Sequence, residues 1–297
     1  TAFGYAHLPH AGVGLAREEF IINNYIKAHP LALLQHRQLK DASLSAAIQT
    51  MIRGFGDEET YFIEKLSYGV AKIAAAFYPH TVIVRFSDFK SNEYRNLLGG
   101  AYFEPEEENP MIGWRGASRY YSPAYKPAFG LECRAIRYVR EQLGLSNVAV
   151  MIPFCRTVKE LLQVQATMAE FGLARGEAGL RLFLMAELPS NVLLAAEFAK
   201  HIDGFSIGSN DLTQLTLGLD RDSALVAGLY DERDEAVKTL LRMLIRTAKA
   251  AKVKVGICGQ GPSDFPEFAR FLVEEGIDSI SVTPDSFVKT VRALADL

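Results

Sequence analysis

Cysteine is scarce in this sequence, and the three that occur, Cys133, Cys155 and Cys258, are far apart. Scattered cysteines in an odd number argue against a disulfide framework and indicate a reducing compartment. No two of them have the spacing of zinc ligands. The sequence therefore predicts neither a disulfide-stapled nor a zinc-stabilised fold, and we expect a cytoplasmic location.

A strong net charge and a long apolar run are also missing. Lys and Arg number 32 against 35 Asp and Glu, so no basic field exists to attract nucleic acid or anionic lipid. No run approaches the ~18 apolar residues of a membrane span. The opening TAFGYAHLPHAG also lacks the basic and then apolar pattern of a signal peptide. We expect neither a nucleic acid nor a membrane as partner.

Nucleotide-binding signatures are absent or weak. There is no G-x-x-x-x-G-K-[ST] loop, and GVGLAR at 12–17 lacks the third glycine of a dinucleotide fingerprint. The six histidines show no pairing that suggests a metal cluster or a catalytic triad. We therefore do not expect ATP to bind to this part of the protein.

What the sequence does contain is an alternation of strand-like and helix-like segments. Its 297 residues, 49% apolar and 23% charged, suit one large globular domain. Short β-branched or apolar runs alternate with amphipathic segments such as 157–172 and 234–252, which is typical of a parallel sheet covered by helices. We count eight runs and predict a (β/α)₈ TIM barrel with extended loops at its C-terminal face. The runs are 12–17, 81–88, 111–115, 148–154, 180–188, 203–209, 253–259 and 279–284.

Carboxylates follow two of these runs, and catalytic groups of such barrels cluster at the C-terminal ends of strands. Glu187 follows LFLMA, which is too apolar to leave a carboxylate without a cation or a hydrogen-bonding partner. Asp211 ends the next run, and the pair could supply oxygen ligands to Mg²⁺. Asp-Leu-Thr-Gln at 211–214 also resembles a helix capping box, so only the partnership with Glu187 favours a metal.

Arginines lie at or near the ends of the first three runs, at Arg17, Arg85 and Arg115. Their guanidinium groups suit bidentate binding of phosphate or carboxylate, and three at equivalent positions predict a multiply charged anion. A single arginine is more often a surface charge or an ion-pair partner. Arg221, in the long segment that follows Asp211, could reach a phosphoryl group or face solvent.

An amide and a thiol complete the set of candidates. Asn210 could hold a substrate carboxylate, although asparagine is also ordinary in a turn between a strand and a helix. Cys258 ends an apolar run and is followed by a Gly-rich turn that permits close backbone approach. It is a candidate reactive thiol, with a small buried apolar residue as the alternative.

Six motifs, in this order, resemble the C-terminal barrel of the PEP-utilizing enzymes. They are GVGLAREEF, VRFSDFKSNEY, ENPMIGWRGASRY, MAELP, SIGSNDLTQLTLGLDRD and GICGQGPSD, and they extend over essentially the whole chain. The superfamily includes phosphoenolpyruvate synthases, pyruvate phosphate dikinases and Enzyme I of the sugar phosphotransferase system. The stretches SNEYRNLLGG and GQGPSD resemble the phosphoenolpyruvate synthase branch most.

The resemblance implies a set of roles at the matching positions. Glu187 and Asp211 would hold Mg²⁺, and Cys258 would be the acid/base at the methyl carbon of pyruvate. Phosphoryl or carboxylate groups would be bound by Arg17, Arg85, Arg115, Ser209, Asn210 and Arg221, with Arg115 also acting in catalysis. One departure stands out: relatives often carry Thr after the first arginine, whereas Glu18 follows Arg17 here. A carboxylate that close could weaken anion binding by Arg17.

The resemblance also implies missing partners. Full-length family members carry an N-terminal ATP-binding domain and a central phosphohistidine domain, neither of which is visible, and the chain starts without Met. We therefore expect residues 1–297 to be one barrel domain of a longer, homodimeric protein. In the whole enzyme ATP phosphorylates the histidine, AMP and phosphate are released, and pyruvate receives the phosphoryl group at this barrel.

Three alternatives remain at this point. One is an Enzyme I-like phosphotransferase or a pyruvate phosphate dikinase barrel, against which the loop motifs count. A second is a Mg²⁺-dependent lyase of oxaloacetate-like acids, which would not need so many arginines. The third is a module that only dimerises or binds ligand when it is separated from the other domains.

Overall fold

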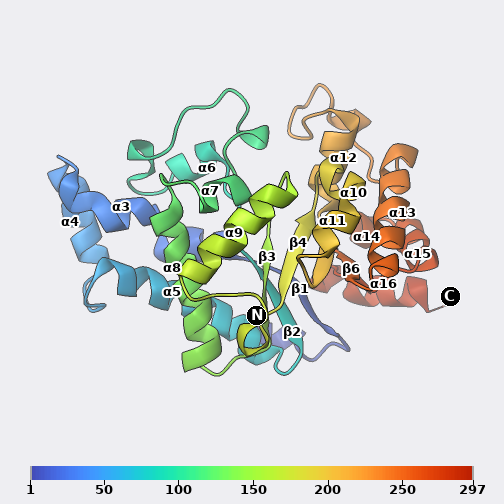
Figure 1. Cartoon of the computed structure of the whole chain (residues 1–297), viewed down its shortest axis with the longest axis horizontal. Coiled ribbons are helices and arrows are strands. Elements are labelled where there is room, and N and C mark those ends of the chain that lie inside the picture. The colour runs from blue at the N-terminus through green and yellow to red at the C-terminus, as the bar shows by residue number, and fades with distance from the viewer. Residues whose placement is uncertain (1, 296–297) are drawn as a thin grey trace. The chain divides into compact units, whose positions relative to one another are not determined.

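The computed structural model describes residues 2–295, along which strands alternate with helices (Figure 1). Among these residues seven strands form one sheet in the chain order β1 to β7, and the pairings from β4 to β7 are parallel. The strands are β1 Gly12–Arg17, β2 Thr81–Arg85, β3 Val148–Ile152, β4 Leu182–Ala186, β5 Gly204–Ile207, β6 Lys254–Ile257 and β7 Ser279–Ile280. The predicted fold class is confirmed.

One of the eight predicted strands, at residues 111–115, is not present in the structure. Residues 111–115 are not a strand, because Pro110–Ile112 forms the 3₁₀-helix η4 and a loop follows it. Pro110 has no N–H to give to a β-ladder and its fixed φ suits the first position of a helix. Gly113, in the middle of the short run, further weakens a strand. The other seven runs each contain one of the observed strands.

The contacts divide the described residues into two compact units. Unit 1 contains residues 2–12, 16–150 and 162–180, and unit 2 contains residues 13–15, 151–161 and 181–295. None of the helices in this part of the chain combines the length and the apolar character that crossing a membrane requires.

Helices fill the long connection that precedes β2 in unit 1. The longest of them, α5, begins after Asp57, whose carboxylate accepts a hydrogen bond from the Thr60 N–H at 2.7 Å, and packs along α8. The helices of this unit are α1 Ala2–Tyr5, α2 Glu18–Ile21, η1 Ile22–Ile26, α3 Pro30–Gln35, η2 His36–Gln38, α4 Ala42–Met51, α5 Glu58–Ala76, α6 Ser91–Arg95, η3 Gly100–Tyr102, η4 Pro110–Ile112, α7 Ala117–Tyr120, α8 Lys126–Arg137, η5 Tyr138–Gln142 and η6 Glu177–Gly179. Helix α9 Val158–Glu170, expected over 157–172, has residues in both units.

In unit 2, helices flank β4, β5 and β6 (yellow to red in Figure 1). Helix α13 confirms the prediction for 234–252: Asp234 caps it by accepting from the Ala236 N–H at 2.8 Å, and its apolar stripe is buried. The helices are α10 Pro189–Leu193, α11 Ala195–Ala199, α12 Ser209–Leu217, η7 Ala227–Leu229, α13 Glu235–Ala250, α14 Gly261–Asp264, α15 Pro266–Glu274, η8 Pro284–Ser286 and α16 Phe287–Leu294.

Strand register brings the ends of β4, β5 and β6 to the same level. Ala186 pairs with Ile207, and Ile207 pairs with Ile257. The next residue of each strand, Glu187, Gly208 or Cys258, therefore lies at one edge of the sheet, where parallel strands of this fold present their functional groups.

Candidate active site

Glu187 and Asp211 lie close together at this edge of unit 2. Each offers a carboxylate oxygen, and the two oxygens are within 4.8 Å of one another. Both residues are buried, with 2% and 8% of their surfaces exposed. Placing two buried carboxylates this close is costly without a cation, and their hard oxygens suit a divalent ion such as Mg²⁺. The donor set therefore fits the metal that the sequence predicts.

The carboxylate of Glu187 is held in a fixed orientation by backbone groups. The Phe154 N–H donates to Glu187 Oε1 at 2.7 Å, and Phe154 takes a left-handed φ of 46° to do so. Such a conformation costs on the order of 1 to 3 kcal/mol for a residue other than glycine. On the other side, a Cβ on Gly208 would lie 2.8 Å from Glu187 Oε2, so a larger residue there would displace the carboxylate. The strand end is thus built around this carboxylate.

The capping-box interpretation of Asp211 is wrong. Helix α12 begins at Ser209 after the N-cap residue Gly208, so Asp211 is its third residue. Gln214, the expected partner in the box, instead accepts a hydrogen bond from the Arg221 N–H at 3.1 Å. Capping therefore does not explain the carboxylate of Asp211, although a negative charge in the first turn of a helix is favourable.

Cys258 follows β6 directly and is partly exposed, unlike Cys133 and Cys155, which are buried. The Ser206 hydroxyl on β5 donates to Cys258 Sγ at 3.3 Å, and Sγ lies 3.5 Å from the Ile207 carbonyl oxygen. Burial raises the pKa of the Cys133 and Cys155 thiols. Cys258 therefore does not fit the alternative of a small buried apolar residue, and of the three thiols it is the one open to a reactant.

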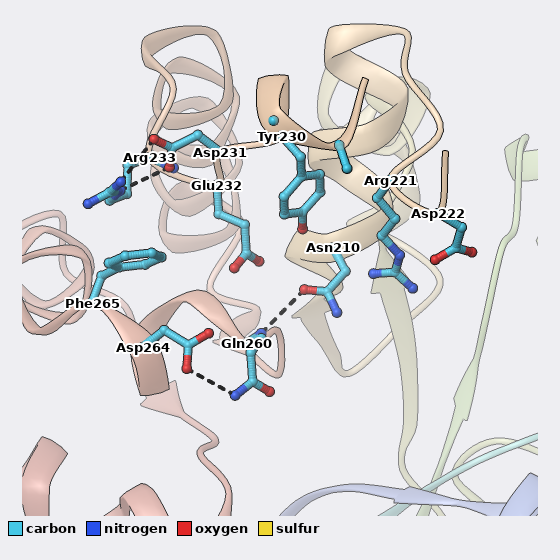
Figure 2. A pocket seen from close by; sticks show the side chains of 12 residues that line it. Asn210, Arg221, Asp222, Tyr230, Asp231, Glu232, Arg233, Gln260, Asp264 and Phe265 are labelled. Carbon is cyan, nitrogen blue, oxygen red and sulfur yellow. Dashed lines mark hydrogen bonds and ion pairs between the residues drawn. The ribbon is translucent and has the colours of Figure 1, made fainter. Parts of the chain in front are cut away.

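A cavity of about 600 Å³ adjoins the start of α12 (Figure 2). Asn210 and Arg221 both line it. The segment that carries Arg221 folds back over α12, where Gln214 accepts from its backbone N–H. Sequence reasoning missed other lining residues, namely Tyr230, Glu232, Gln260 and Asp264. Only the unusual length of the segment 215–233 pointed to Tyr230 and Glu232, whereas Gln260 and Asp264 lie in the motif GICGQGPSD without having been given a role.

Two of the three candidate arginines of unit 1 share one carboxylate. Asp88 accepts from Arg115 Nε at 3.0 Å and Nη2 at 2.7 Å, and lies 3.6 Å from Arg85 Nη1. Arg85 also donates to Glu19 at 2.8 Å. Burial by itself would raise the pKa of Asp88, but Arg115 and Arg85 hold it below its ordinary value. The structure thus brings Arg85 and Arg115 together. Arg17 is exposed, and its guanidinium carbon lies 5.9 Å from the centroid of the Phe20 ring.

Glu18, the departure noted beside Arg17, is not a surface carboxylate. It is fully buried, and no donor from the described residues reaches its carboxyl oxygens, whereas the Glu132 carboxyl is within hydrogen-bonding reach. Burial and the neighbouring Glu132 raise the pKa of Glu18 well above its ordinary value. A proton on Glu18 that is donated to Glu132 satisfies both groups. The effect of Glu18 on anion binding by Arg17 stays a prediction.

Glu132 is in turn the acceptor of a buried hydroxyl network in unit 1. It accepts from the Ser87 N–H at 3.0 Å and the Ser87 hydroxyl at 2.7 Å. The hydroxyls of Tyr94 and Tyr125 extend this network, at 2.5 Å from the Ser87 hydroxyl and 3.4 Å from Glu132 respectively. Burial raises the pKa of Glu132 to about 7. Ser87 and Tyr94 lie in the motif VRFSDFKSNEY, but no motif includes Tyr125 or Glu132, and the sequence did not indicate that these groups meet.

The fold and these groups define a class of protein: an α/β-barrel domain with candidate metal ligands and a thiol at the carboxyl ends of its strands. A solved malate synthase from Haloferax volcanii shows the same fold, with a TM-score of 0.53 and 13% sequence identity over 99% of this chain and 69% of that one. The family model for the PEP-binding domain of PEP-utilising enzymes matches residues 2–297. The chain belongs to this family.

Curated relatives at high identity carry the name phosphoenolpyruvate synthase. The protein from Synechocystis is 62% identical, that from Aquifex aeolicus 57% and that from Escherichia coli 55%, each over 100% of this chain. The chain spans 36% to 40% of the length of these three relatives. It corresponds to one part of proteins that are considerably longer.

Proposed function

We propose that this chain is the substrate-binding barrel of a phosphoenolpyruvate synthase. In that role pyruvate binds at the barrel, takes a phosphoryl group from a phosphohistidine of another domain and leaves as phosphoenolpyruvate. The overall reaction converts ATP, pyruvate and water to AMP, phosphoenolpyruvate and phosphate. The alignment of Glu187, Asp211 and Cys258 at one sheet edge of unit 2 is the observation that carries the proposal. The family membership and the names of the relatives support it.

Pyruvate must lose a methyl proton before its oxygen can accept a phosphoryl group, and the resulting enolate concentrates negative charge. Glu187 and Asp211 are the residues that would hold Mg²⁺. When bound, the ion supplies Lewis-acid stabilisation of that charge, worth several kcal/mol. The Phe154 N–H and the bare backbone of Gly208 keep the Glu187 carboxylate oriented for this task.

Cys258 is the group that we assign to proton transfer at the methyl carbon. It is partly exposed at the strand end, and the Ser206 hydroxyl that donates to its sulfur would stabilise the thiolate form. Thiolate takes the methyl proton in the forward direction, and the thiol returns it in the reverse direction.

Substrate anions are assigned to the remaining candidates. Asn210 binds the substrate carboxylate, and Arg221 reaches a phosphoryl oxygen from the cavity wall. The predicted contact of Ser209 with the substrate is not kept, because its buried hydroxyl already donates to Glu232. Arg17, Arg85 and Arg115 bind phosphoryl or carboxylate oxygens, with Arg115 acting on the transferring group. The ion pairs of Arg85 and Arg115 with Asp88 would hold their guanidinium groups in place. Loss of one such donor costs about 3 kcal/mol, on the order of a hundredfold in rate.

The proposal includes the rest of a larger enzyme. The phosphohistidine and ATP-binding domains would come from the part of the protein outside residues 1–297, and the whole would be a cytoplasmic homodimer. The relatives, of which this chain spans 36% to 40%, have room for such domains.

Deuterium exchange into the pyruvate methyl group, followed by NMR with Mg²⁺ and without ATP, tests the proposal. The chain should catalyse exchange that stops on chelation of the metal, and Cys258→Ala should abolish it while phosphoenolpyruvate binding persists. Exchange by Cys258→Ala at the wild-type rate would refute the role of the thiol. If neither the chain nor the full-length enzyme exchanges the methyl protons, the enolisation step is wrong.

A further inference from the structure

Glu232 is a buried carboxylate on the wall of the cavity in Figure 2, and no motif or proposed role includes it. Only 4% of its surface is exposed. The Ser209 hydroxyl donates to Oε1, and the Gly261 N–H is a second donor. A Cβ on Gly261 would lie 2.7 Å from Oε2, so the turn after Cys258 is shaped around this carboxylate. Glu232 therefore links the start of α12 to that turn.

The position of Glu232 decides how the neighbouring Asn210 amide is oriented. In one orientation Asn210 Nδ2 donates to Glu232 Oε1 at 3.0 Å, and its Oδ1 accepts from Arg221 Nη1 at 3.1 Å. The reverse orientation, drawn in Figure 2, leaves Oδ1 to accept only from the Gln260 N–H at 3.3 Å. It also sets the amide oxygen against a carboxylate and the amide nitrogen against a guanidinium group. A carboxylate only accepts and a guanidinium group only donates, so the first orientation is favoured.

An amide nitrogen carries two hydrogens, and Glu232 uses one of them. The second is then available to a ligand, in a cavity whose proposed occupant carries a carboxylate. We propose that Glu232 is a positioning residue, which fixes the Asn210 amide so that its nitrogen, and not its oxygen, faces the substrate carboxylate. This inference rests on the proposed binding of pyruvate and phosphoenolpyruvate.

A purely structural role for Glu232 predicts a different outcome. If the residue only anchors the turn after Cys258, its replacement lowers stability and affects every function of the site alike. If it orients Asn210, its replacement weakens ligand binding only as long as Asn210 is present. The two roles separate when affinity is measured in both backgrounds.

The experiment compares Glu232→Gln with Glu235→Gln in the full-length enzyme. Glu235 begins α13 three residues later, and its exposed carboxylate pairs with Arg242 at 2.6 Å. The Kd for phosphoenolpyruvate, measured by titration calorimetry with Mg²⁺, should rise about tenfold for Glu232→Gln, as expected for a charged hydrogen bond. KM for pyruvate should rise by a similar factor with kcat changed less than about twofold. Glu235→Gln should match the wild type in both.

Asn210→Ala provides the second background. Adding Glu232→Gln to it should change the Kd by less than about twofold, because the amide to be oriented is gone. A full tenfold loss in this background, or no loss in the single variant, would overturn the inference.

The reversed pair Asn210→Asp with Glu232→Gln guards against a trivial loss of folding. The carboxylate at 210 can accept from both the new amide and Arg221, so the unfolding midpoint should return to that of the wild type. Affinity should not return, because position 210 then has no N–H for the ligand. Recovery of affinity together with stability would show that Glu232 is only an anchor.

Failure of this inference is distinguishable from failure of the proposed function. If the wild-type enzyme binds neither phosphoenolpyruvate nor pyruvate, both are refuted. If the wild type binds and Asn210→Ala weakens binding while Glu232→Gln does not, the proposed function stands and the positioning role of Glu232 is wrong.

Discussion

The buried Glu132 predicts a pH dependence of stability that one substitution should remove. Burial raises its pKa from 4.5 to about 7, against the opposing hydrogen bonds from Glu18 and Ser87. A carboxyl group with a pKa that is higher in the folded than in the unfolded state binds more protons when folded. Its contribution is therefore fully present below pH 4.5 and is lost as the pH rises through 7.

The shift from 4.5 to about 7 is 2.5 pKa units, and each unit corresponds to about 1.36 kcal/mol. The free energy of unfolding should therefore fall by about 3 kcal/mol from this group between pH 4.5 and pH 8. Glu132→Gln removes the titration of this group and weakens the upward shift in the pKa of Glu18, because Glu132 is one of the causes of that shift. It also removes an acceptor of the Ser87 N–H and hydroxyl, but that cost does not depend on pH.

Urea unfolding of the wild type and Glu132→Gln, followed by circular dichroism from pH 4.5 to 8.5, measures the difference. The advantage of the wild type should shrink by about 3 kcal/mol as the pH rises, mostly between pH 5 and 7. The control is Glu141→Gln, at an exposed carboxylate shortly after α8, the helix that carries Glu132. Its free energy of unfolding plotted against pH should run parallel to that of the wild type. Parallel curves for Glu132→Gln would refute the shared-proton interpretation of Glu18 and Glu132.

Three further substitutions test the edge of unit 2. Ser206→Ala removes the hydroxyl that donates to Cys258 Sγ at 3.3 Å. Alkylation of Cys258 by iodoacetamide at pH 7 should then slow about fivefold. An unchanged alkylation rate would show that the hydroxyl does not stabilise the thiolate. Gly208→Ala places a Cβ 2.8 Å from Glu187 Oε2. The substitution should lower the free energy of unfolding by about 1 kcal/mol or more, as at other overpacked sites. It should also weaken Mg²⁺ binding measured by calorimetry. Glu187→Gln keeps an acceptor for the Phe154 N–H but removes the negative charge of the side chain. The rise in unfolding temperature on adding Mg²⁺ should therefore disappear in this variant. If the rise persists, the metal binds elsewhere.

Most of the fold could be predicted from the sequence because its elements are coded locally. The run ending before Glu187 is apolar over the length of a strand, the run ending before Cys258 alternates buried with less buried residues, and 234–252 has a helical apolar stripe. The error at 111–115 also has a local cause, since a short apolar run that contains Gly and follows Pro carries little strand signal. The same strand ends led to the candidate residues, because parallel strands present their carboxyl ends at one edge.

The tertiary structure alone decided the state of the groups around those candidates. Nothing beside Glu18 in the sequence indicates that the pKa of its carboxyl is raised, because that shift depends on burial and on Glu132, which lies on another helix. Likewise, Asn210 and Arg221 are visible in one motif, but the orientation of the Asn210 amide also depends on Glu232, which lies outside that motif. Sequence periodicity specifies which residues are buried and where elements end, whereas protonation and hydrogen-bond polarity depend on which distant groups packing brings into contact.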